Sequence, residues 1–279
     1  MRDKAIGIFD SGLGGLTVVR ELQRLVPREN LVYFGDTGRV PYGTRSPETI
    51  ARYAREDAAF LLSKNVKLII AACGTVSSVA MDAMRDLPVP FLGVVEPAAA
   101  AAVKASKTNK IGVLGTTATV NSRAYERAIG RLDPDARVTA TDCPLFVPLV
   151  EAGWIGGDDP VTLAVAQRYL GGMREEGPDT LILGCTHFPL IAPVFRKIMP
   201  GAALIDAGYE TAKAAAALLG GSGLLSGRET PGTSDYYVSD KPEGFSRIAA
   251  LFLGAPVDGQ VRTVEAGAAD AVGAERDGR

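Results

Sequence analysis

The sequence LIIAACGT at residues 68–75 returns in similar form as LILGCTH at residues 181–187. Each is an apolar run of the kind that forms a buried strand, and each contains a cysteine near its end, Cys73 or Cys185. Two further pairs of segments match in the same order along the chain: IGIFDS (6–11) with IGVLGT (111–116), and GVVEPAAAAAV (93–103) with LIDAGYETAKAAAA (204–217). Self-similarity at a nearly constant separation indicates a structural repeat, so the sequence predicts a duplicated α/β unit.

Short apolar runs alternate with longer helical patterns along the rest of the chain. The predicted strands are Ala5 to Phe9, Leu31 to Phe34, Val66 to Ala72, Phe91 to Val95, Lys110 to Leu114, Arg137 to Ala140, Thr180 to Leu183 and Ala203 to Ile205. This alternation is typical of parallel sheets covered by helices. We therefore expect an α/β protein with two pseudo-symmetric, doubly wound domains and mainly parallel sheets. Both cysteines fall at carboxyl ends of strands, where such sheets bind ligands, which predicts an active-site cleft between the domains.

The duplication and the segment after Gly220 together predict where the domains divide. That segment breaks with GGSG and resumes with TSDYYVSD, which is too short for a third domain, so we expect it to return to the first. The expected division is a first domain of residues 1–96 plus 210–265, carrying Asp10 and Cys73, a second domain of residues 97–209, carrying Cys185 and His187, and a flexible tail at 266–279. The loop GDTGRVPYGTRS (35–46) is long for a connection in a compact α/β unit, so we expect it to close over a ligand.

Composition excludes several classes of protein. The 279 residues include 30 Lys and Arg against 32 Asp and Glu, and this balance does not favour nucleic-acid binding. No apolar stretch reaches a membrane-spanning length and no signal peptide is visible, so no membrane association is expected. The three separated cysteines fit reduced thiols in a cytoplasm. There is one histidine and no Cys-x-x-Cys spacing, which argues against a local zinc module or a thioredoxin-type pair.

Two matched cysteines facing one cleft suit the inversion of a stereocentre. Inversion by proton transfer removes hydrogen from one face of a carbon and delivers it to the other, and a thiolate with a thiol can do both. Asp10 ends the first strand beside Cys73, and His187 follows Cys185 by two residues, so each cysteine has a candidate proton-holding assistant. Hydroxyl groups near the strand ends form a natural cradle for a substrate carboxylate: Ser11, Thr75 and Thr186.

Structural roles remain alternatives for each of these residues. A buried cysteine often acts as a small hydrophobic side chain, and for Cys143, which has no repeat partner, we expect only that role. Asp10 could cap the helix that follows it, and His187 could be a core histidine. The fold also permits a non-catalytic amino-acid sensor, since two-lobed clefts bind ligands in many proteins. A metal site would need Cys73, Cys185, His187 and Asp10 to converge from distant segments.

The longest motifs resemble those of the glutamate racemases within the aspartate/glutamate racemase superfamily. The resemblance covers about residues 5 to 255 and is carried by FDSGLGGLTV (9–18), YFGDTGRVPYG (33–43), CPLFVPLVEAG (143–153), LILGCTHFPLI (181–191) and YVSD (237–240). It implies a cofactor-independent isomerase that interconverts L- and D-glutamate without pyridoxal phosphate or metal. It also implies a cytoplasmic role in supplying D-glutamate for peptidoglycan, and hence in cell wall biogenesis and cell shape. Family members are often homodimers.

The same resemblance assigns roles to individual residues. It implies that Cys73 acts on the D-enantiomer and Cys185 on the L-enantiomer. The residues implied to assist catalysis are Asp10, His187 and Glu151. The residues implied to bind substrate are Asp10, Ser11, Tyr42, Gly43, Gly74, Thr75, Thr186 and His187, with Thr116 and Thr119 as further candidates.

One position departs from the family pattern. Most members read Cys-Asn-Thr where this chain reads Cys73-Gly74-Thr75, so the side-chain amide that would contact substrate is missing. Glycine keeps its backbone N–H and leaves room for water. Racemisation of aspartate or another acidic amino acid therefore stays open as an alternative activity.

Overall fold

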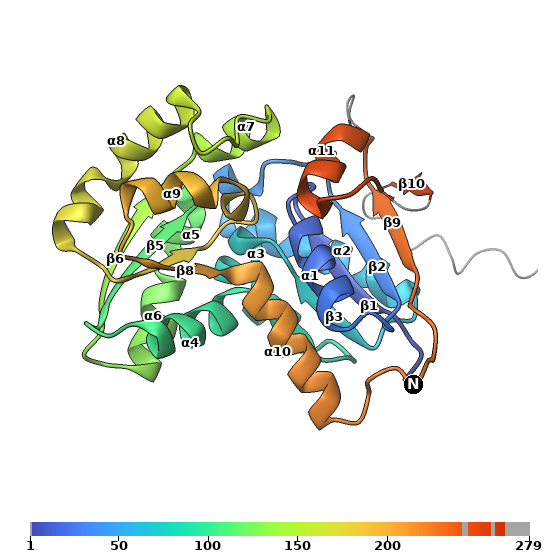
Figure 1. Ribbon diagram of the computed structural model, residues 1–279. Coiled ribbons are helices and arrows are strands. Elements are labelled where there is room, and N and C mark those ends of the chain that lie inside the picture. Colours follow the sequence, from blue (N-terminus) through green and yellow to red (C-terminus); the bar gives the residue numbers. More distant parts are fainter. Residues whose placement is uncertain (1, 242–244, 258–259, 266–279) are drawn as a thin grey trace, which may run out of the picture.

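The chain folds into alternating strands and helices (Figure 1). The computed structural model describes residues 2–241, 245–257 and 260–265, so the tail predicted at 266–279 lies outside the described residues. The strands are β1 (Ile6–Asp10), β2 (Leu31–Gly35), β3 (Leu68–Ala71), β4 (Phe91–Gly93), β5 (Lys110–Gly115), β6 (Arg137–Asp142), β7 (Thr180–Leu183), β8 (Ala203–Asp206), β9 (Ser234–Val238) and β10 (Val261–Thr263). Each predicted strand overlaps one of β1 to β8, which confirms those predictions.

Helices connect the strands. The α-helices are α1 (Leu16–Leu25), α2 (Pro47–Ser63), α3 (Gly74–Val79), α4 (Val95–Ala105), α5 (Thr117–Ser122), α6 (Ala124–Leu132), α7 (Phe146–Glu151), α8 (Pro160–Glu176), α9 (Ala192–Ile198), α10 (Ala207–Gly221) and α11 (Phe245–Leu253). The 3₁₀ turns are η1 (Tyr42–Thr44), η2 (Met81–Met84) and η3 (Phe188–Ile191). Local signals explain some boundaries: α2 starts at Pro47 because Ser46 Oγ accepts a hydrogen bond from the Thr49 amide at 3.3 Å.

The strands form two sheets, and every strand pair in the described residues is parallel. The first sheet has the order β10-β9-β2-β1-β3-β4 and the second the order β6-β5-β7-β8. The second order repeats the β2-β1-β3-β4 part of the first, with β5 in the place of β1 and β7 in the place of β3. This topology confirms the expected α/β class with parallel sheets and supports the duplicated unit.

We call the six-stranded sheet with its connections the first half, and the four-stranded sheet with its connections the second half. Strand β9 pairs with β2, so the chain returns to the first half after α10, as expected. The domain division at residues 96/97 and 209/210 stays a prediction. No helix in the described ranges is long and apolar enough to cross a membrane.

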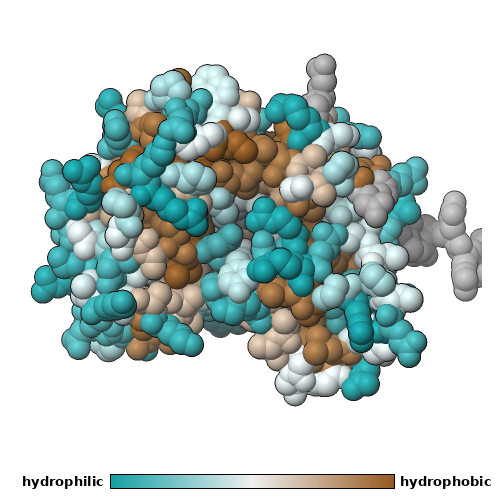
Figure 2. All heavy atoms as spheres, in the orientation of Figure 1, coloured by the Kyte–Doolittle hydropathy of each residue, from teal (hydrophilic) through white to brown (hydrophobic). Residues whose placement is uncertain are grey.

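Alternating side chains of β1 anchor helices on both faces of the first sheet. Ile6 and Ile8 lie in the cluster that contains Leu16 of α1, whereas Phe9 lies in the cluster that contains Ile50 of α2. The first of these clusters continues into the second half through buried residues such as Phe146 and Leu183. Figure 2 shows apolar side chains gathered between the two halves on the face turned to the viewer. The halves therefore share apolar contacts around the site described next.

Candidate active site

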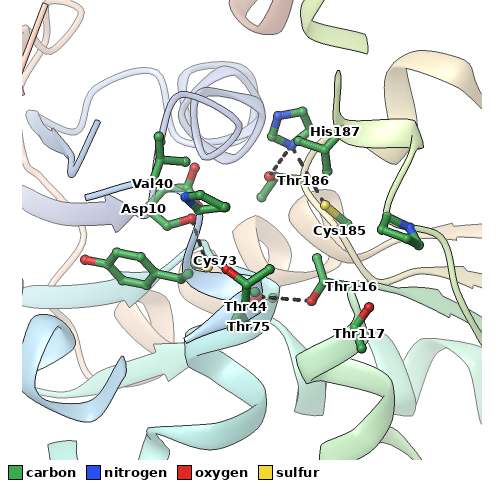
Figure 3. Close-up of a pocket in the computed structure, with 18 of the residues that line it drawn as sticks. Asp10, Val40, Thr44, Cys73, Thr75, Thr116, Thr117, Cys185, Thr186 and His187 are labelled. Carbon is green, nitrogen blue, oxygen red and sulfur yellow. Dashed lines mark hydrogen bonds between the residues drawn. The ribbon is translucent and has the colours of Figure 1, made fainter. Parts of the chain in front are cut away.

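A pocket of about 230 Å³ lies between the halves, beyond the carboxyl ends of their strands (Figure 3). Cys73 reaches it from the end of β3 and Cys185 from the end of β7. Both thiols are nearly buried, at 4% and 8% exposure. Because β3 and β7 occupy equivalent places in the two sheets, the duplicated fold brings matched cysteines to one cavity.

The predicted site residues gather around this pocket. Those that line it are Asp10, Ser11, Tyr42, Gly43, Cys73, Gly74, Thr75, Thr116, Glu151, Cys185, Thr186 and His187. Thr119 does not line the pocket, but its hydroxyl oxygen lies 3.0 Å from that of Thr116, which does. Cys143 is fully buried, does not line the pocket and donates to the Thr141 carbonyl at 3.6 Å.

Cys73 is the less exposed of the two thiols. Its thiol donates to Ser11 Oγ with an S–O distance of 3.5 Å. Burial, and then the nearby charge of Asp10, raise the pKa of Cys73 to about 12, which favours the thiol form. Asp10 is itself buried and accepts a hydrogen bond from the Gly15 amide at 2.9 Å. Burial raises the pKa of Asp10 above its ordinary value despite that bond.

Cys185 lies beside the imidazole ring of His187. Its sulfur lies 3.8 Å from His187 Nδ1, and the opposite ring nitrogen, Nε2, lies 3.0 Å from Glu151 Oε1. Burial alone would lower the pKa of His187, but the hydrogen bonds to Cys185 and Glu151 outweigh it and raise that pKa to about 10. His187 is therefore an imidazolium at neutral pH.

Threonine hydroxyls join the halves at the floor of the pocket. Thr75 Oγ1, at the start of α3, lies 3.1 Å from Thr116 Oγ1, which caps α5. Figure 3 shows this pair between the two cysteines and below His187. These hydroxyls and the backbone N–H groups of the adjoining helix starts can bind a carboxylate.

The hydroxyl of Tyr42 is turned away from the pocket. It is hydrogen-bonded to two buried carboxylates, Asp36 and Asp57, so the backbone and ring of this residue form the pocket wall. The part of Tyr42 in substrate binding stays a prediction, and its hydroxyl makes a contact that the sequence did not reveal.

Sequence reasoning missed several lining residues: Gly12, Val40, Pro41, Thr44, Thr117, Pro144, Val147, Pro148 and Gly184. Three of these belong to the long loop that was expected to cover a ligand, so its length was the available signal. The apolar residues at 144–148 carry no chemical signature, and only packing places them in the wall. In the described part of the chain, no three His, Cys, Asp or Glu side chains converge as metal ligands.

The chain has the two-sheet α/β fold of solved glutamate racemases and is an isomerase of the racemase class. The family described as Asp/Glu/Hydantoin racemase matches residues 6–215, and the chain belongs to this family.

Curated relatives support this assignment along almost the whole chain. The chain is 47% identical over 253 residues to the glutamate racemase of Geobacter metallireducens, covering 90% of this chain and 93% of that protein. It is 43% identical over 268 residues to the glutamate racemase of Neisseria meningitidis, covering 95% and 98%.

Solved structures of glutamate racemases share the fold. The Francisella tularensis enzyme, in complex with D-glutamate, has a TM-score of 0.88 and 35% identity and covers 97% of this chain and 100% of its own. The Thermus thermophilus enzyme, in complex with β-chloro-D-alanine, has a TM-score of 0.83 and 46% identity, with coverage of 95% and 98%.

Proposed function

We propose that this racemase interconverts L- and D-glutamate by a two-base mechanism in which Cys73 and Cys185 work from opposite faces of the α-carbon. The observation that carries the proposal is the meeting of two equivalent strand-end thiols in one pocket. The curated relatives named above are glutamate racemases, and one solved neighbour holds D-glutamate.

The steps that start from L-glutamate follow from the assignment of Cys185 to the L-enantiomer. The Cys185 thiolate, paired with the His187 imidazolium, takes the α-proton, and the C–H electron pair stays on the α-carbon as a carbanion. The Cys73 thiol then gives its proton to the opposite face and becomes a thiolate. The reverse reaction uses the same groups in exchanged roles, and Asp10 and His187 assist proton exchange at the two thiols between turnovers.

The pocket also suits the substrate's charges. The Thr75 and Thr116 hydroxyls offer donors to a carboxylate, and Ser11 lies beside the Cys73 thiol. The backbone of Gly43 and Gly74 and the Thr186 hydroxyl complete the proposed binding set. No cofactor has a part in these steps, because the thiols and the carbanion account for every proton and electron pair.

The cellular role follows from the resemblance to glutamate racemases. We propose that the protein supplies D-glutamate for peptidoglycan synthesis in the cytoplasm and that it works as a homodimer. Both points rest on the resemblance to the family. Restored growth of a D-glutamate auxotroph tests the first point, and light scattering tests the second.

The decisive experiment is the incubation of L-glutamate in D₂O with wild type, Cys73→Ser and Cys185→Ser. A two-base enzyme places deuterium on the product enantiomer while the remaining substrate keeps its hydrogen at early times. Each serine variant should lose at least about 100-fold in racemisation rate, since a hydroxyl replaces an acid/base group. Undiminished racemisation in either variant refutes the mechanism.

Gly74 favours one second candidate, the racemisation of aspartate or another acidic amino acid. Comparing the kcat/KM of L-glutamate with that of L-aspartate decides between the substrates. Saturable binding of both without any turnover would instead indicate a non-catalytic amino-acid-binding protein.

A further inference from the structure

A buried cluster of acids lies directly behind the loop that walls the pocket. Asp36, which follows β2, and Asp57, on α2, are both fully buried. They share one guanidinium: Arg39 Nε lies 2.5 Å from Asp36 Oδ2, and Arg39 Nη2 lies 2.9 Å from Asp57 Oδ1. Arg39 also pairs with Glu56 at the edge of the cluster and lies over the ring of Tyr53, 4.1 Å from its centre. Three carboxyl groups therefore surround one cation.

The Tyr42 hydroxyl bridges the two buried acids. Its oxygen is hydrogen-bonded to Asp36 Oδ2 and lies 3.0 Å from Asp57 Oδ2. A hydroxyl has one proton to donate, so it cannot donate to both carboxylates at once. Two ionised acids on the same hydroxyl would also repel each other strongly, because both are fully buried. Both hydrogen bonds of Tyr42 can form when one acid is neutral and donates its own proton to the Tyr42 oxygen.

The surrounding donors indicate which acid keeps its proton. Asp36 accepts from Arg39 and Tyr42 and, through Oδ1, from Ser239 Oγ at 2.7 Å. Among the described residues, Asp57 has no counterpart of this serine: beside its contact with Tyr42, it accepts from Arg39 Nη2 at 2.9 Å. Burial, followed by the charge of Asp36, raises the pKa of Asp57 well above its ordinary value. Geometry and the raised pKa together therefore place the neutral carboxyl group at Asp57.

The hydrogen-bond chain ends at the pocket. Val40, Pro41, Gly43 and Thr44 line the cavity on both sides of Tyr42, and Val40 and Thr44 are among the side chains drawn around it in Figure 3. Gly43 lies against the second half, where an added Cβ would sit 3.4 Å from Thr116 Cβ. A shift of the loop would therefore change both the pocket wall and its contact with the opposite half.

We propose that Asp57 is a positioning residue that, as a neutral carboxyl group donating to Tyr42, holds the segment from Pro41 to Thr44 in place against the substrate. This inference rests on the proposed racemase function for its kinetic consequence. Its structural content, a protonated Asp57, stands independently of turnover.

The kinetic test compares Asp57→Asn, Asp57→Ala and Tyr42→Phe. The asparagine amide can donate to Tyr42 while its oxygen accepts from Arg39, so this variant should stay within about threefold of the wild-type KM. The alanine and phenylalanine variants break the chain, and each should lose about tenfold to 100-fold in kcat/KM, mainly through a higher KM. If Asp57→Asn lowers kcat/KM as much as Asp57→Ala does, the inference that Asp57 is a neutral carboxyl group is wrong. If both Asp57→Ala and Tyr42→Phe keep the wild-type KM, the positioning role is wrong.

A matched control separates positioning from general instability. Asp206 caps α10 by accepting from the amides of Gly208 and Tyr209 at 2.9 and 3.1 Å, and it does not line the pocket. Asp206→Ala should lower the Tm and leave KM unchanged. If Asp57→Ala does not fold, Tyr42→Phe carries the test, because it removes a single oxygen.

An infrared difference spectrum tests the protonation state without turnover. The C=O stretch of a protonated carboxyl group should be present at neutral pH in wild type and lost in Asp57→Asn, with the contribution of other acids cancelled by subtraction. If the protein fails to racemise glutamate but shows this band, the proposed function is wrong and the protonated state of Asp57 is still supported. Absence of the band would overturn the inference itself.

Discussion

Gly74 offers a test of how closely the two halves must approach. An added Cβ at this position would lie 2.3 Å from the carbonyl oxygen of Gly184 in the second half. Carbon and oxygen in contact need about 3.3 Å, so the side chain of Gly74→Ala or Gly74→Asn requires a shift of roughly 1 Å (3.3 − 2.3).

The Gly184 backbone cannot easily supply this shift. Its amide donates to the Leu114 carbonyl at 2.8 Å, and Tyr125 lies so near that a Cβ added to Gly184 would be 3.0 Å from Tyr125 Cε2. The displacement would thus fall on the separation of the halves and move Cys73 relative to Cys185. A misplacement of about 1 Å in a catalytic site can cost about 100-fold in rate, equal to about 2.7 kcal/mol of transition-state stabilisation.

The assay is steady-state racemisation of L-glutamate by wild type, Gly74→Ala and Gly74→Asn. The family pattern would suggest that asparagine restores a substrate contact and improves the enzyme. The close approach predicts instead that both variants lose activity to a similar extent. Gly130→Ala is the matched control, because an added Cβ there meets nothing within 4 Å. A Gly74→Asn variant with kcat/KM equal to or above that of wild type would refute the reasoning.

Three further predictions concern single groups. Glu151→Gln removes the carboxylate that supports the His187 imidazolium, so the pKa of His187 should fall and the alkaline limb of the kcat/KM profile should move to lower pH; an unshifted profile would contradict this role. Because the folded pKa of His187, about 10, is raised above its ordinary value of 6.5, its stabilising contribution is complete below pH 6.5 and is lost as the pH rises through 10. Urea unfolding should show that wild type is more stable than His187→Asn at pH 6.5. This difference in the free energy of unfolding should narrow as the pH rises to 10. Cys143→Ala should leave racemisation unchanged and cost about 1 kcal/mol of stability in the same assay, whereas loss of turnover would give Cys143 a catalytic part.

The sequence predicted the elements that rest on local periodicity. Runs such as Thr180 to Leu183 form strands because apolar side chains on both faces suit a buried parallel sheet, and Ser46 starts a helix because its own side chain satisfies a nearby amide. The internal repeat then placed Cys73 and Cys185 at equivalent strand ends. These features depend on residues close in sequence or on a duplication visible in it.

The contacts between residues within the site were harder to predict from the sequence. The resemblance to glutamate racemases indicated Glu151, but its hydrogen bond to His187 Nε2 joins residues far apart in the chain. The bond between Tyr42 and Asp57 likewise depends on how a loop folds back on α2. Residue types suggest such partners, and only packing selects among them.

By itself, therefore, the sequence determined a pair of parallel α/β units and the two cysteines that each unit delivers to its strand end. Tertiary structure alone decided that Gly74 meets the Gly184 backbone, that His187 lies between Cys185 and Glu151, and that Tyr42 turns from the pocket to two buried acids. The physical reason is that periodicity records burial and backbone shape one element at a time. The protonation and spacing of the site depend instead on distances between elements, which are fixed only when the two halves pack together.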